Sequence, residues 1–88
     1  MKVKFKSSFI RDLKRVKEKP IKDRVREAIE LVERAPNLHE IKNLKKLKDG
    51  DRYYRISLGE YRLGLTLERD IVTFVRFLHR RDLYRYFP

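Results

Sequence analysis

The fold is decided by residues 53–88, which read YYRISLGEYRLGLTLERDIVTFVRFLHRRDLYRYFP. The first half of this stretch alternates apolar and polar side chains, which is the period of a β-strand with one buried face. Gly59-Glu60 interrupts the alternation and predicts a two-residue hairpin turn, with glycine supplying the positive φ at its first position. The side chains predicted to face the core are Tyr54, Ile56, Leu58, Tyr61, Leu63, Leu65 and Leu67. Those predicted on the opposite face are Tyr53, Arg55, Ser57, Arg62, Gly64 and Thr66.

A third strand and a short tail complete this stretch. Glu68-Arg69-Asp70 predicts another turn, and residues 71–78 are then apolar at almost every position. Such a run is typical of a central strand that is covered on both faces. After His79 we expect a single helical turn or an extended flap.

Upstream, the sequence predicts a strand and two helices. Residues 2–6 alternate polar and apolar side chains, and Ser7 or Ser8 is expected to cap a following helix by accepting a backbone N–H. Pro20 suits the first turn of a second helix, which ends at Ala35-Pro36. Apolar stripes mark the core faces of the two helices: Phe9, Leu13 and Val16, and Ile21, Val25, Ala28, Ile29 and Val32.

The order of these elements predicts the fold class. Residues 37–50 are interpreted as a connection that Leu44 and Leu47 pin to the core, with a turn at Asp49-Gly50. The order β-α-α-β-β-β predicts one α+β domain over residues 1–88, in which a helical hairpin packs on one face of a mostly antiparallel sheet. Its parts are an N-terminal strand, the hairpin, a three-stranded antiparallel meander and a short C-terminal segment. The other sheet face is then expected to be open and lined by outward-pointing arginines.

Charge is the strongest compositional signal. Lysine and arginine number 24 against 13 aspartates and glutamates, a net charge of +11. That excess predicts a polyanionic partner, although a heavily charged solvated surface is a competing explanation. The chain has no cysteine, which excludes disulfides, thiolate catalysis and cysteine metal sites. Neither a signal peptide nor a membrane span is evident, so we expect a cytoplasmic protein, and a chain of this length has room only for a shallow site.

Two blocks of the sequence resemble a known family. Residues 42–67, KNLKKLKDGDRYYRISLGEYRLGLTL, and residues 74–88, FVRFLHRRDLYRYFP, are similar to the conserved blocks of the RelE/ParE toxins of prokaryotic type II toxin–antitoxin systems. The ending most resembles archaeal-type RelE proteins. The resemblance implies a ribosome-dependent endoribonuclease that cuts mRNA in the A site, with the RNA 2′-hydroxyl as nucleophile and without a metal or other cofactor. ParE members share the fold but inhibit DNA gyrase.

The resemblance assigns roles to three residues of the meander. Arg55 lies where the family often has a lysine or arginine at the first outward position of the strand. Arg62 matches the arginine that stabilises the phosphate. Ser57 falls where some RelE members have a second lysine thought to act as a base, so the chain departs from the pattern there, and Ser57 is assigned to substrate binding instead.

In the tail, Arg80 or Arg81 matches the arginine before the end of the chain, and Tyr84 matches the tyrosine that stacks on a base or assists proton transfer. Cleavage by a 2′-hydroxyl needs a base, positive charge for the phosphorane and an acid. Arginine stays protonated and is a poor base. Histidine is the side-chain type that ordinarily changes its charge near neutral pH, so we hypothesise that His79 or Tyr84 carries the proton transfer. The alternative is that His79 only caps the strand.

Partners and alternative functions follow from the same residues. Lys45, Lys46 and Lys48 are interpreted as electrostatic contacts with ribosomal RNA, and Arg76 as a further substrate contact. The expected partners are the ribosome with its mRNA and rRNA, and a small antitoxin that blocks the site or displaces residues 80–88; no membrane partner is expected. The alternatives are a ParE-like gyrase inhibitor, a plain RNA-binding module with stacking tyrosines and an attenuated toxin.

Overall fold

The computed structural model describes residues 1–48 and 50–88. Its sheet has the strand order β1-β5-β4-β3-β2, in which β2 to β5 form an antiparallel meander and β1 pairs with β5 in parallel. The α+β class and the meander predicted from the sequence are therefore confirmed. In chain order the elements are β1 (Lys2–Phe5), α1 (Ser7–Arg15), α2 (Lys19–Arg34), the 3₁₀ turn η1 (Leu38–Glu40), β2 (Leu44–Lys46), β3 (Tyr53–Leu58), β4 (Tyr61–Glu68), β5 (Ile71–His79) and α3 (Leu83–Tyr86).

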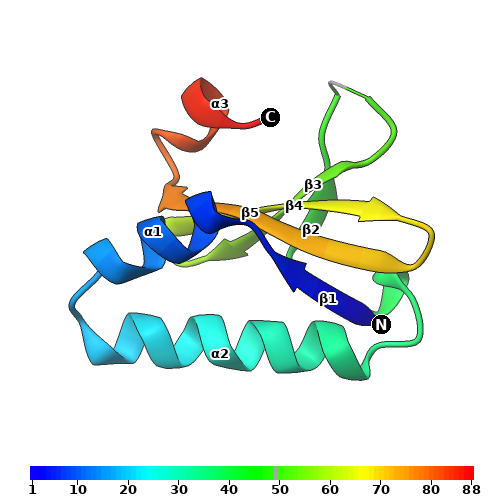
Figure 1. The fold of residues 1–88 in the computed structure, drawn as a ribbon, viewed down its shortest axis with the longest axis horizontal. Coiled ribbons are helices and arrows are strands. Elements are labelled where there is room, and N and C mark those ends of the chain that lie inside the picture. The colour runs from blue at the N-terminus through cyan, green and yellow to red at the C-terminus, as the bar shows by residue number, and fades with distance from the viewer. Residues whose placement is uncertain (49) are drawn as a thin grey trace.

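The main core lies between α2 and one face of the sheet. Figure 1 shows α2 running beneath the strands, and we call the sheet face that it covers the helix face. The apolar positions of α2 recur at helical spacing, so they form one stripe, and Pro20 lies within its first turn as expected. The buried core side chains are Phe9, Val25, Ala28, Val32, Leu38, Ile56, Leu63, Leu65, Val72, Phe74 and Phe77.

Helix α1 does not begin with the predicted serine cap. Lys6 is the N-cap residue and its side chain makes no capping bond. Instead, the Ser8 hydroxyl donates to the Val75 carbonyl on β5 at 2.6 Å. The reason is the position of the helix: β1 pairs with β5 only as far as Phe74, and α1 lies along the part of β5 beyond it. Ser8 therefore satisfies a strand group that β1 does not reach, and the capping prediction was wrong.

A β-bulge in β5 changes which side chains face the core. Leu65 pairs with Phe74 and Gly64 with Arg76, so Val75 is an extra residue without a partner on β4. Because a one-residue insertion reverses the alternation of the strand, Phe74 and Phe77 both pack in the main core. The bulge thus determines where every later residue of β5 points.

We call the opposite sheet face the outer face. The sequence predicts that this face is open, but the structure shows that part of it is covered. Leu47, Leu83 and Phe87 form a second buried cluster there, with Tyr53, Val75 and Leu78 packed against it. The C-terminal segment folds back over the sheet as the single turn α3, which Figure 1 shows on the side away from α2. β5 is consequently covered on both faces, as expected, but the site has to lie beside the tail.

The connection also differs from the prediction. Leu44–Lys46 forms a short strand, β2, against β3, and this adds a fifth strand to the sheet. Three residues are too few to show an alternation in the sequence. Gly59 has φ 60° in the hairpin between β3 and β4, as predicted. The predicted turn at Asp49-Gly50 includes Asp49, which lies outside the described residues. In the part of the chain described, every helix is too short or too polar to cross a membrane.

Candidate active site

Four polar side chains lie side by side at one end of the outer face. Lys45 pairs with Arg55, and Ser57 pairs with Arg62, directly across the strands. Directly opposed residues of antiparallel strands have Cβ atoms about 4.5–5.5 Å apart, and like charges in such pairs repel. An anion bound over Lys45, Arg55 and Arg62 would relieve this repulsion. We call these four residues the basic ladder.

Arg62 is held in place by the backbone of the neighbouring turn. Its Nη1 donates to the carbonyl oxygens of Gly59 at 2.8 Å and Tyr61 at 2.9 Å. Within residues 1–48 and 50–88, its Nε and Nη2 atoms make no hydrogen bond to protein. A guanidinium with one fixed nitrogen and further donors available suits bidentate binding of a phosphate.

Arg55 lies deeper in the basic ladder than Arg62. Its Nη1 donates to the Ser57 hydroxyl at 2.5 Å and to the Asn43 carbonyl at 3.2 Å. Its Nε is buried and lacks a hydrogen-bond partner in the described part of the chain. A buried donor without a partner is costly, but this atom exposes no surface to a ligand. The Arg55 hydrogen bonds to described residues all use Nη1, so Nη2 is the donor that could bind a phosphate oxygen. The Ser57 hydroxyl thus helps to fix the Arg55 guanidinium.

The two tail arginines differ in their surroundings. Arg80 forms an ion pair with Glu60, with Nε 3.0 Å from the carboxylate, and its backbone N–H donates to the Glu60 carbonyl at 2.7 Å. Arg81 is exposed and forms no ion pair with a described residue. Because the charge of Arg80 is already compensated, Arg81 is the better phosphate ligand of the two.

His79 lies on the other side of the sheet from Arg62. It pairs with Tyr61, and its ring meets the Tyr61 ring edge-on at a centroid distance of 5.8 Å, next to the main core. Its Nδ1 accepts the Arg81 N–H at 3.3 Å, and its Nε2 is 3.7 Å from a Glu60 oxygen. The Nδ1 atom is thereby occupied as a hydrogen-bond acceptor. The bulge in β5 turns His79 to this side, so its position does not favour the hypothesis that His79 carries the proton transfer.

The tail places two exposed tyrosines beside the outer face. Tyr84 is 62% exposed and Tyr86 is 52% exposed, whereas Leu83 between Asp82 and Tyr84 is buried. Leu83 packs in the same cluster as Leu78, and Leu78 pairs with Arg62. α3 therefore packs on the same sheet face as Arg62.

The remaining predicted contacts are spread out. Lys46 is 3.7 Å from Asp51 in an exposed ion pair, and Lys48 is exposed. Arg76 is only 23% exposed and is paired with Asp12 of α1, so it is engaged inside the protein rather than presented to a substrate. These residues do not join the basic ladder.

One other charged group stands out near the tail. Arg52 donates to the Tyr53 hydroxyl at 3.1 Å and pairs with Glu68 at 2.7 Å. The hydrogen bond to Tyr53, together with the charge of Glu68, raises the pKa of Arg52 above its ordinary value, so it remains a cation. Among the described residues, no three His, Asp or Glu side chains come together as a metal site would require.

Sequence reasoning missed Phe87, which holds the tail on the outer face. A Cβ built on Gly64 would lie 2.8 Å from the Phe87 ring, so the ring rests directly on the backbone of β4. The signal was present in the sequence, since a glycine within a strand often marks a close approach by another group. Asp12, buried on α1, was also missed, and helical periodicity gives no sign of its role.

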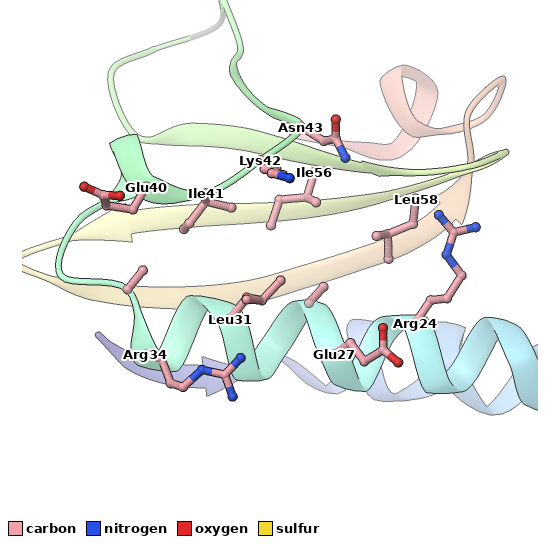
Figure 2. A pocket seen from close by; sticks show the side chains of 12 residues that line it. Arg24, Glu27, Leu31, Arg34, Glu40, Ile41, Lys42, Asn43, Ile56 and Leu58 are labelled. Carbon is pink, nitrogen blue, oxygen red and sulfur yellow. The ribbon is translucent and has the colours of Figure 1, made fainter.

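A separate groove opens between α2 and the β2–β3 edge of the sheet. It measures about 510 Å³. Figure 2 shows Leu31 of α2 across the groove from Ile41 and Ile56, with Arg24 reaching up toward Leu58. Its floor is apolar and its rim carries both signs of charge, from Arg24, Arg34, Lys42, Glu27 and Glu40.

Comparison with known proteins decides the family. Residues 3–84 match the model of the ParE toxin of the type II toxin–antitoxin system parDE. The chain is 40% identical to Toxin RelE3 of Methanocaldococcus jannaschii over 89 residues, all of both proteins. The chain belongs to the RelE/ParE toxin family.

Solved structures of RelE toxins have the same fold. One chain of a RelB–RelE antitoxin–toxin complex from Methanococcus jannaschii is similar with a TM-score of 0.80 and 37% identity, covering 97% of this chain and 99% of that one. A chain of the archaeal RelE–RelB complex from Pyrococcus horikoshii has a TM-score of 0.73 and 22% identity over 90% and 93% of the two chains. The RelE-like toxin fold, with its helices, N-terminal strand and meander, is thereby established for this chain.

Proposed function

We propose that this RelE-type toxin is a ribosome-dependent endoribonuclease that cleaves mRNA in the A site. The observation that carries the proposal is the basic ladder, in which Arg62 has donors available beside Arg55 and Lys45. Arg81 and Tyr84 are exposed on the tail, and Leu83 beside Tyr84 packs in one cluster with Leu78, the partner of Arg62 on β5. This arrangement suits binding of a phosphate and stacking on a base, which are the needs of RNA cleavage.

The chemistry follows from these groups. The RNA 2′-oxygen attacks the adjacent phosphorus while its proton is removed, and the bond from phosphorus to the 5′-oxygen then breaks as that oxygen gains a proton. The products are a 2′,3′-cyclic phosphate and a 5′-hydroxyl. Arg62 and Arg81 stabilise the dianionic phosphorane with charge-assisted hydrogen bonds, and Arg55 holds a non-bridging oxygen.

The proton transfer falls to Tyr84 in this proposal. Arginines stay protonated and do not serve as bases. His79 lies on the helix face, and its Nδ1 already accepts the Arg81 N–H. Tyr84 carries an exposed phenol on the same tail as Arg81, so it can donate its proton to the departing 5′-oxygen and regain one from the 2′-hydroxyl through a water. Replacement of His79 by glutamine should accordingly leave the pH–rate profile unchanged.

The test in cells is induction of the chain followed by mapping of mRNA 5′ ends by primer extension. Cuts confined to translated codons support the proposal. Intact mRNA with induced DNA damage would overturn it and favour a ParE-like gyrase inhibitor instead. This second candidate is kept because of Ser57, which stands where some RelE toxins have a lysine. In this chain its hydroxyl accepts a hydrogen bond from Arg55.

The lysines of the β2 region should set the salt dependence of ribosome binding. Replacing Lys45, Lys46 and Lys48 by alanine is expected to weaken binding and to reduce the slope of log K against log salt by about 0.7 for each RNA phosphate that these lysines neutralise. The matched control removes three exposed lysines from the α1–α2 region, Lys14, Lys17 and Lys22. Equal slopes for the two triple variants would contradict a specific role for the β2 lysines.

We further propose that the groove beside α2 is a docking site for the cognate antitoxin. Its apolar floor and mixed-charge rim fit an amphipathic segment. Leu31, 53% exposed on this floor, is an apolar side chain that a partner would bury. The Leu31→Asp variant should weaken antitoxin binding about tenfold or more by titration calorimetry, with its thermal stability little changed.

The control for that prediction is Ile10→Asp, because Ile10 is 38% exposed on α1 and does not line the groove. The antitoxin is sought as a small acidic open reading frame beside the gene. If Leu31→Asp binds that protein as tightly as the wild type, the antitoxin docks elsewhere.

A further inference from the structure

We propose that Asp12 and Arg76 are positioning residues, which hold the C-terminal segment of residues 80–88 in the geometry that cleavage requires. The inference rests on the proposed nuclease function for its kinetic test. It concerns a buried ion pair that lies outside the basic ladder and contacts neither Arg62 nor Arg81 in the described structure.

Asp12 binds both side chain and backbone of β5. Its carboxylate accepts from Arg76 Nε at 2.7 Å and Nη2 at 3.1 Å, and from the Phe77 N–H at 2.9 Å. The Phe77 N–H lies just after the bulge, on the edge that β1 no longer covers. Together with the Ser8 hydroxyl on Val75, Asp12 fixes the bulge from α1.

Arg76 also contacts the C-terminal segment. Its guanidinium carbon lies 5.5 Å from the centroid of the Tyr86 ring on α3, a cation–π contact. Asp12 is 5% exposed, so it keeps Arg76 in one orientation against solvent competition. A chain of contacts therefore links Asp12 on α1, Arg76 next to the bulge in β5, and Tyr86 on α3.

A role in positioning explains the pair better than a role in stability. Buried ion pairs add little net stability over apolar residues of the same size, since removing charges from water is costly. An ion pair with two hydrogen bonds instead holds the guanidinium in one orientation. Tyr84 and Arg81 lie on the short tail, whose other attachments are the ion pair and backbone hydrogen bond between Arg80 and Glu60 at its start and the apolar contacts of Leu83 and Phe87. Apolar contacts hold a segment down but tolerate sliding, and a shift of about 1 Å can cost about 10²-fold in rate.

The kinetic test uses Asp12→Asn, which keeps the shape of the side chain and removes its charge. On mRNA-programmed ribosomes we expect kcat to fall about tenfold or more, with KM changed by less than about twofold, as for a loss of transition-state geometry. Arg76→Lys should retain more activity than Arg76→Gln, because it keeps the charge facing Asp12. The Asp23→Asn control removes two surface ion pairs on α2, those with Lys19 and Arg26, and should cleave at the wild-type rate.

The structural test needs no catalysis. Amide hydrogen exchange of Asp12→Asn should speed up in residues 80–88, while exchange in α2 stays near that of the wild type. Val32→Ala, a core variant away from the tail, controls for general destabilisation. The proposal is overturned if tail exchange is unchanged in Asp12→Asn, or if kcat falls no further than in Val32→Ala at equal stability. If the wild type itself does not cleave mRNA, the nuclease proposal fails while the exchange result still decides whether the pair anchors the tail.

Discussion

The Arg62→Ala variant is expected to cleave mRNA about 10²–10³-fold more slowly than the wild type on programmed ribosomes. The reason is that Arg62 is oriented before substrate arrives, by the Gly59 and Tyr61 carbonyls, and offers its remaining donors where the phosphorane charge develops. Single-turnover cleavage with excess toxin measures this directly. Ribosome binding should change much less, because Arg62 is one charge among the many that make up the +11 excess.

Two comparisons sharpen this prediction. Arg62→Lys keeps the charge but not the planar two-point geometry, so its rate should lie between those of the wild type and Arg62→Ala. Arg80→Ala is the matched tail variant, and since Glu60 already compensates its charge, its rate should fall less than that of Arg81→Ala. If Arg62→Ala cleaved at a rate within about threefold of the wild type, Arg62 would not be the main phosphate ligand.

The second large effect is expected for Phe87→Ala, which should release the tail from the sheet. Phe87 is 2% exposed and rests on Gly64, and its ring also meets Tyr53 edge-on at 5.7 Å. Truncating a buried phenylalanine costs about 3–5 kcal/mol where the site cannot relax. Because the cluster holds only the end of the chain, the tail should detach before the domain unfolds. Cleavage should then fall about 10²-fold, since Arg81 and Tyr84 lose their positions.

Limited proteolysis and hydrogen exchange measure the release of the tail independently of activity. Residues 80–88 should become accessible while α2 and the meander keep their protection. Phe5→Ala is the control, because Phe5 is a 44% exposed phenylalanine on β1 that stacks on Phe9 and Phe74 rather than on the tail. Unchanged protection of the tail in Phe87→Ala would mean that the second cluster does not hold it.

The sequence predicts most of the fold because its signals are local. The alternation in residues 53–67 assigns the faces of β3 and β4, and glycine at the Gly59 turn fixes their register. Arg55, Ser57 and Arg62 therefore fall on one face, and the structure agrees with this placement. Helical periodicity likewise identifies the buried stripe of α2.

The errors arise where long-range packing overrides local pattern. The bulge at Val75 depends on α1 covering the end of β5, so no alternation in residues 71–79 predicts the side on which His79 lies. The tail docks through Leu47 and Phe87, which are 40 residues apart, and only Gly64 hints at the contact. The short strand β2 forms because the edge of β3 is available for pairing. Three residues alone are too few for the sequence to predict a strand there.

The most direct test of the central claim is the chemistry of the cut ends. Ribosomes carrying a short mRNA are incubated with the purified chain, and the 5′ fragment is analysed by mass spectrometry. Attack by the 2′-oxygen predicts a 2′,3′-cyclic phosphate on that fragment, and no cleavage of an mRNA with a single 2′-deoxynucleotide at the scissile position. Cleavage of the 2′-deoxy substrate at the wild-type rate, or intact mRNA in every reaction, would contradict the account.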